Sequence, residues 1–286
     1  MEGRFNIRQG AAAFAPIVGA FGALAVTAII VLFTVPPHPT PYRAPFLALA
    51  AGLLIVAMIG SFAGSLGLAA IGAEEDSTAN LVPATLSLHV SVMLSVVAVL
   101  AAFEVLAALY LPESKTLLAL ITASAGLVGV LTTSFGVSDA WHCGPTNASE
   151  RSEWLKTQWI KSHADAYTWT NRVMIVSSVP IALGIILRLI GAEARPTTAS
   201  ANWVTGVGFI ITIVAVLAGF LRARHPVNGR QKGLRKTEAF VASLAISLYV
   251  LGLMIFLPLD SHIIRFKPHA RLASGSCTTS RPSGPR

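Results

Sequence analysis

Three histidines and an aspartate lie near the ends of apolar segments, where they could do acid–base or metal chemistry: His89, Asp139, His142 and His163. Histidine and aspartate are common zinc ligands, and a zinc ion with three protein ligands and one open position can activate water. The spacing is not diagnostic, because Cys143 directly follows His142 and the two would not bind one ion comfortably. Polar contacts at a membrane interface are therefore the favoured interpretation. We assign no catalytic residue, predict no cofactor and leave a metal open.

Glu104 is the one charged residue inside an otherwise apolar segment. It lies about seven residues, roughly 10 Å along a helix, from the end of that segment. Carboxylates inside a membrane are costly and mark candidate functional sites. Arg188, near the end of another apolar segment, is the expected partner because its long stem can reach inward. The favoured interpretation is a structural Glu104–Arg188 pair, or a protonated Glu104 bonded to a hydroxyl; proton coupling or substrate contact is the alternative.

The composition indicates which elements must position these groups. Of the 286 residues, 54% are hydrophobic and 12% are charged, whereas soluble domains carry roughly 25% charged residues. A soluble fold of this size could not cover so much apolar surface. The chain is therefore predicted to use lipid as part of its solvent.

Seven apolar segments are long enough to cross a membrane as helices, which takes about 20 residues each. Proline marks several of their ends, as at Pro83 and Pro112, because proline lacks the N–H that a helix interior needs. The sequence thus predicts an all-α integral membrane protein, a bundle of seven transmembrane helices, in one membrane domain over residues 1–266. Residues 267–286, rich in Ser, Arg, Pro and Gly, are predicted to be a disordered tail. The predicted spans cover about 11–35, 45–71, 84–111, 116–138, 170–191, 203–221 and 238–258.

The long segment between the fourth and fifth spans contains two possible capping boxes. The first, Asn147 with Glu150, would open a short helix through about Lys161. Its tryptophans fall opposite its basic residues, a pattern typical of a helix lying in the membrane interface. The second, Ser162 with Asp165, would open the fifth span. We predict one cytoplasmic interfacial helix here, either a connector that seals the bundle, which is favoured, or a lid over a site.

Lysine and arginine in the loops predict the orientation. Twelve of them fall on the side of the N-terminus and four on the opposite side before the tail, which places the N-terminus in the cytoplasm and the C-terminus outside. Six belong to one loop, in a chain of net charge +8, and are expected to contact anionic lipid head groups rather than nucleic acid: Arg222, Arg224, Arg230, Lys232, Arg235 and Lys236.

Small residues in the second span predict close helix packing. Gly60 and Gly64 form a GxxxG pair, which lets two helix backbones approach. Packing within the chain is favoured, and a second subunit is the alternative partner.

Several function classes are excluded by missing motifs. No Gly precedes any Lys, so there is no Walker A loop and no intrinsic ATPase; HExxH and GxSxG are also absent. Two hypotheses remain for this multi-pass protein. The favoured one is a small permease-like or accessory membrane component with a role in transport, which is not an enzyme. The alternative is a membrane enzyme acting on a lipid-soluble substrate at the cytoplasmic interface through the His and Asp groups above.

Overall fold

The structure is a computed structural model, and it describes residues 7–34, 43–73, 81–110, 159–189, 197–224 and 236–256. These residues form α1 (Ile7–Thr34), α2 (Arg43–Ala73), α3 (Leu81–Tyr110), α6 (Trp159–Leu189), α7 (Thr198–Arg224) and α8 (Lys236–Phe256). The described part of the chain contains no strand, so the all-α prediction is confirmed there. The predicted span 116–138, residues 147–158 of the predicted interfacial helix and the tail 267–286 lie outside the described residues.

Four of the described helices are long and apolar enough to cross a membrane. The stretches that qualify, in α1, α2, α3 and α7, are Gln9–Thr34, Ala44–Ala73, Ser87–Ala107 and Thr198–Arg222. The helices α6 and α8 correspond to the predicted fifth and seventh spans, but their apolar stretches, Asn171–Gly184 and Phe240–Ile255, are shorter. The described helices thus support a membrane location with four spans by length and composition.

The start of α6 corrects one prediction. Trp159–Lys161 was assigned to the end of an interfacial helix, and Ser162 to the cap of a new one; the structure has one continuous helix from Trp159 to Leu189. The reason is local, because no glycine or proline occurs between Trp159 and Pro180 to interrupt the backbone hydrogen bonds. About three turns into α6, the Arg172 guanidinium lies over the Trp169 ring, 5.5 Å from its centroid.

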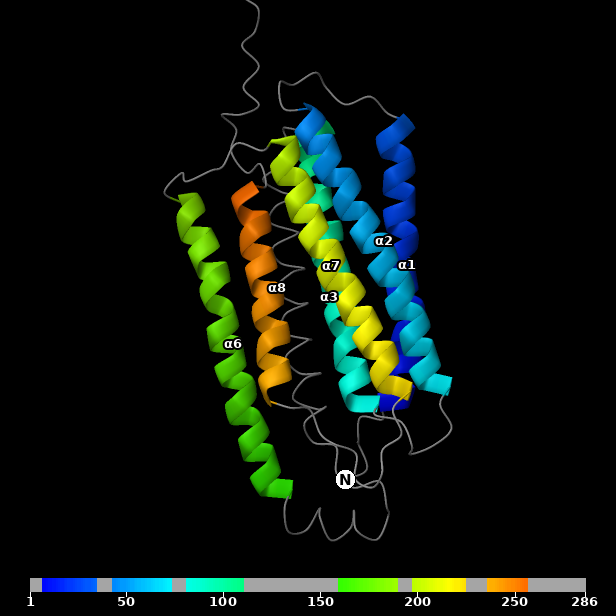
Figure 1. Cartoon of the computed structure of the whole chain (residues 1–286), viewed down its shortest axis with the longest axis vertical. Helices are drawn as coiled ribbons and strands as arrows, with labels where there is room; N and C mark the ends of the chain where they lie inside the picture. Colours follow the sequence, from blue (N-terminus) through cyan, green and yellow to red (C-terminus); the bar gives the residue numbers. More distant parts are fainter. Residues whose placement is uncertain are drawn as a thin grey trace, which may run out of the picture.

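The helices stand side by side, roughly along the long axis of the molecule (Figure 1). The colours of Figure 1 show α1, α3, α6 and α8 beginning at the lower end, and α2 and α7 ending there. Helix α2 packs against α1, α3 and α7, whereas α6 packs chiefly against α8, which in turn contacts α3 and α7. The described helices therefore form a four-helix unit, α1–α2–α3–α7, and a helix pair, α6–α8, on its flank.

Side-chain size distinguishes the inner and outer faces of α7. Its outward side chains are large and apolar, with Trp203 75% and Ile210 62% exposed. Such exposure suits contact with lipid rather than water. Small or short side chains line the inward face at intervals of three or four residues: Ala201, Thr205, Gly208, Thr212, Ala215 and Gly219. Arg222 follows at the next such interval, near the end of the helix.

A capping box fixes the start of α7. The Ser200 backbone N–H donates to Thr197 Oγ1 (3.1 Å), and the Thr197 backbone N–H donates to Ser200 Oγ (2.9 Å). Both donors would otherwise lack a partner at a helix N-terminus, so the pair defines where the helix begins.

Candidate functional site

Three serines form a row along one buried face of α3. Ser87, Ser91 and Ser95 are spaced by four residues, so they lie one above the other on the helix and are buried. Ser95 Oγ donates to the Ser91 carbonyl of its own helix (2.9 Å), and Ser91 Oγ donates to the Gly60 carbonyl of α2 (3.2 Å). From Ser87 to Ser95 the serine row spans roughly 12 Å of the helix.

An ion pair stands at one end of the serine row. Arg222, in the last turn of α7, donates from Nη1 to Ser87 Oγ (3.1 Å) and from Nη2 to Glu238 Oε1 of α8 (3.2 Å). The guanidinium thus joins the C-terminal end of α7 to the N-terminal ends of α3 and α8. The Arg222 and Glu238 side chains are 32% and 28% exposed, so the ion pair is partly accessible.

The other end of the serine row reaches a cluster of hydroxyl groups around Gly60. A methyl group at Gly60 would overlap Ser95 Oγ and would lie 3.0 Å from Thr212 Cγ2 and 3.2 Å from Ser91 Oγ. The missing side chain therefore lets α2, α3 and α7 meet closely. We call Ser91, Ser95 and Thr212, together with the buried Ser61 that follows Gly60 in the chain, the hydroxyl cluster.

Two members of the hydroxyl cluster lack a hydrogen-bond partner. Ser61 and Thr212 are fully buried, and neither Ser61 Oγ nor Thr212 Oγ1 bonds to any group in the described part of the chain. A buried hydroxyl without a partner costs about 1–3 kcal/mol. The hydroxyl cluster is thus a polar region inside an apolar bundle, and two of its four hydroxyl groups are free to bond a further molecule.

Tyr249 of α8 adds a further buried hydroxyl. Its side chain is 5% exposed, and its Oη lies against Gly208, one turn from Thr212 on α7. Tyr249 Oη also has no hydrogen-bond partner among the described residues. The unpaired hydroxyls therefore extend from the four-helix unit to α8.

The structure describes two of the four residues in the predicted acid–base set, and they lie on different helices. His89 lies near the start of α3, with a buried Nε2 that has no hydrogen-bond partner among the described residues. His163 lies in the second turn of α6. Asp139 and His142 lie outside the described residues. Within the described ranges, no three His, Cys, Asp or Glu side chains are grouped to hold a metal ion.

Glu104 lies in α3 and is half-buried, and Arg188 lies in the last turn of α6. Glu104 belongs to α3, whereas α6, which carries Arg188, packs chiefly against α8. The pairing of Glu104 with Arg188 therefore stays a prediction. It can be tested by reversing both charges, which should restore the stability that either reversal alone removes.

The serine row and the Arg222–Glu238 ion pair were missed at the level of the sequence. The i, i+4, i+8 spacing of the serines was visible there, but serine is also common in apolar helices that use it for packing alone. Arg222 was assigned to a basic loop, whereas the structure places it in α7 with a carboxylate partner. Head-group binding by Arg222, Arg224 and Lys236 stays a prediction, as it does for the rest of that loop (Arg230, Lys232 and Arg235), which lies outside the described residues.

Gly60 and Gly64 both face helices of the same chain. Gly60 faces α3 and α7, and a methyl group at Gly64 would lie 2.8 Å from Val92 of α3 and 3.6 Å from Val18 of α1. The GxxxG pair therefore contributes to packing within the four-helix unit.

Comparisons of this chain with protein-family models, with curated proteins and with solved structures find no match. The arrangement of side chains is thus the basis for a functional hypothesis.

Proposed function

We propose that the protein is a small permease-like or accessory membrane component, in which a polar route between α2, α3 and α7 carries a proton or a small polar solute. The observation that carries this proposal is the hydroxyl cluster, with the unpaired Ser61 and Thr212 hydroxyls inside a bundle whose helices can span a membrane. Polar groups at that depth are costly and commonly mark pathways for ions or substrates.

The Arg222–Glu238 ion pair would close this route at its predicted cytoplasmic end. A partly exposed ion pair contributes only about 1 kcal/mol or less, so thermal motion can open it readily. The serine row would then connect the opened end with the hydroxyl cluster. The four-helix unit contributes Arg222 to this ion pair, and the neighbouring α6–α8 pair contributes Glu238 of α8.

The same proposal includes seven crossings with a cytoplasmic N-terminus. Helices α3 and α6 run in the same direction (Figure 1), so the chain between them has to return from one end of the bundle to the other. The apolar segment 116–138 is long enough for that crossing. The excess of Lys and Arg on the N-terminal side supports the orientation.

Flux measurements on the full chain in liposomes test the route. The probes are protons, followed with an enclosed pH-sensitive dye, and glycerol, followed by vesicle shrinkage. We expect at least one of them to cross faster than in protein-free liposomes. Thr212→Val keeps the shape of the side chain and removes the unpaired hydroxyl, so it should lower that flux about tenfold, as expected for a lost contact of about 1.4 kcal/mol at the barrier.

Thr27→Val is the matched control, because Thr27 is an exposed α1 residue whose Oγ1 bonds only to the Ala23 carbonyl of its own helix (3.0 Å). It should leave the flux unchanged. If neither probe crosses faster than in protein-free liposomes, or if both variants lower the flux equally, the route is contradicted.

A membrane enzyme is the second candidate, and His89 is the observation that favours it. A buried imidazole nitrogen without a partner is available to a ligand, and α6, which carries His163, begins at the same end of the bundle (Figure 1). Zinc analysis of the purified full chain tests this candidate. A stoichiometric metal that is lost in His89→Ala would replace the permease hypothesis, and its absence in both proteins would remove the metal-dependent form of the enzyme hypothesis.

A further inference from the structure

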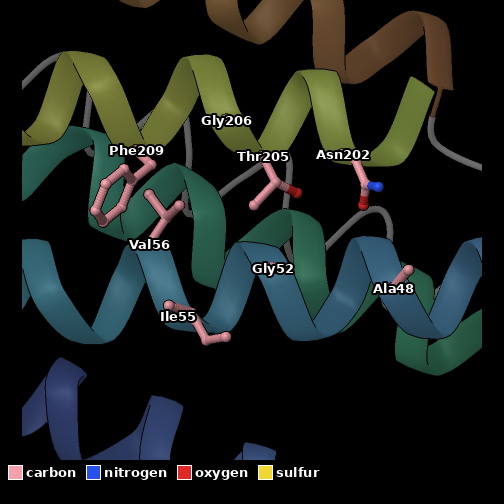
Figure 2. A pocket seen from close by; sticks show the side chains of 8 residues that line it. All are labelled: Ala48, Gly52, Ile55, Val56, Asn202, Thr205, Gly206 and Phe209. Atoms are coloured by element: carbon pink, nitrogen blue, oxygen red, sulfur yellow. The ribbon is translucent and has the colours of Figure 1, made fainter. Parts of the chain in front are cut away.

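A groove of about 330 Å³ runs between α2 and α7 on the outer surface of the four-helix unit. Figure 2 shows its wall on α7 above and its wall on α2 below, with Gly52 and Gly206 between the larger side chains. The groove lies toward the end of the molecule where both of these helices begin, which is opposite to the Arg222–Glu238 ion pair. Eight residues line it: Ala48, Gly52, Ile55, Val56, Asn202, Thr205, Gly206 and Phe209.

The lining changes from polar to apolar along the groove. Asn202 lies at one end, roughly 6 Å from the start of α7, with Thr205 one turn further along the helix. Phe209 and Val56 lie at the other end (Figure 2), closer to the middle of their helices. A membrane span carries its polar groups at the depth of the head groups and its apolar groups deeper, and the groove has the same polarity gradient as a bilayer lipid.

The groove is open toward the surroundings of the bundle. Ile55 and Phe209, one on each wall, are 43% and 40% exposed. A methyl group at Gly206 would meet no atom within 4 Å, so the glycine leaves real space. Because the two walls belong to helices that can span a membrane, the medium that meets this opening is the hydrocarbon of the bilayer.

We propose that the groove binds one acyl chain of a membrane glycerolipid, with the ester region of the lipid at Asn202 and the chain lying along Gly206 toward Phe209 and Val56. The volume is at the lower end of the range for ligand pockets, about 300–1,000 Å³, which suits a single chain rather than a whole lipid. The Asn202 amide can donate to an ester carbonyl of that lipid. This site is distinct from the proposed polar route, since none of its eight lining residues belongs to the serine row or the hydroxyl cluster.

Native mass spectrometry of the full chain, extracted from liposomes of phosphatidylethanolamine and phosphatidylglycerol, tests the site. We expect one phospholipid to stay bound after most others are stripped. Gly206→Leu fills the groove with a side chain that has room to fit, and it should lower retention about tenfold because the leucine occupies the space in which the acyl chain would pack. Asn202→Leu should lower retention about fivefold through the loss of one hydrogen bond.

Gly252→Leu is the matched control, because a methyl group at Gly252 of α8 also meets no atom within 4 Å and Gly252 does not line the groove. It should retain the lipid as the wild type does, and the thermal unfolding midpoint of all three variants should verify that they fold. Equal retention by Gly206→Leu and the wild type would overturn the proposal. A bound mass equal to that of a free fatty acid would also overturn it. So would a cross-link between two copies of the chain at Trp203, next to Asn202, because a second copy would then occupy this face.

Discussion

Two helix interfaces among the described helices are built differently. Where α2 meets α3 and α7, Gly52 and Gly60 face short polar side chains, and Gly60 has atoms of three neighbouring residues within 3.2 Å of the place where its Cβ would be. Where α6 meets α8, the one glycine that approaches closely, Gly184, faces the long side chains of Met254 and Leu251. The first interface therefore brings backbones together, and the second joins helices through side chains.

This difference indicates where the molecule is rigid and where it can move. Close backbone contact fixes the relative position of two helices, because no flexible atom can give way. Methionine and leucine ends can change rotamer and allow small shifts. The four-helix unit is thus expected to act as a scaffold, and movement is expected between α6 and α8. The Arg222–Glu238 ion pair joins the four-helix unit to α8.

The largest expected effect comes from Gly60→Ala. The added methyl group would overlap Ser95 Oγ and lie 3.0 Å from Thr212 Cγ2, and overpacking of this kind costs about 2 kcal/mol even after the gain in helix propensity. Unfolding of the full chain in mixed SDS and mild-detergent micelles measures this change. A loss below the experimental error would show that α2 and α3 are not in close contact.

Thr212→Val should act in the opposite direction. It removes a fully buried hydroxyl without a partner and keeps the volume, so the free energy of unfolding should rise by about 1 kcal/mol. The same variant should lower flux, as proposed above. Destabilisation by a similar amount would mean that this hydroxyl has a partner, and the hydroxyl cluster would lose its main support.

The coupling energy between α7 and α8 at the Arg222–Glu238 ion pair is expected to be smaller than these two effects. A double-mutant cycle with Arg222→Gln and Glu238→Gln should give a coupling energy of about 0.5–1 kcal/mol, because the pair is partly exposed. Added salt should reduce it, since exposed charges are screened. A coupling of zero at low salt would separate α8 from α7 at this end of the bundle.

The smallest effect should be that of Gly184→Ala, the same substitution at the looser interface. Its methyl group would lie 2.9 Å from Met254 Sδ and 3.3 Å from Leu251 Cδ1, which are flexible side-chain ends. Their adjustment and the gain in helix propensity should nearly cancel, leaving a change within about 0.5 kcal/mol. Equal losses at Gly60 and Gly184 would contradict the contrast between the two interfaces.

The sequence predicted the helices better than the polar contacts. The predicted spans at 45–71 and 84–111 agree closely with α2 and α3. The length and apolar composition that a membrane span requires are local properties, which can be read directly from the sequence. The helix boundary predicted at Ser162 was wrong. A capping pattern can only start a helix where the preceding residues are not already helical, and here α6 begins at Trp159.

Apart from Arg222 and Gly60, which were given other roles, the residues of the candidate site were not predicted, and the physical reason is different. His89 and Glu104 were identified as candidates from the sequence because charged or titratable groups are rare in apolar segments. Thr212, Ser95 and Tyr249 are ordinary residues of apolar helices, and burial without a partner is what distinguishes Thr212 and Tyr249. Burial depends on neighbours that the local pattern does not contain.

By itself the sequence determined that the described chain forms apolar helices suited to lipid, because a helix satisfies its backbone hydrogen bonds within its own segment. The tertiary structure alone decided which side chains meet. Ser87 and Arg222, 135 residues apart, form a hydrogen bond because α3 and α7 pack together with these ends adjacent. Gly60 has its importance for the same reason, since the closeness of a helix contact depends on the side chains of both partners.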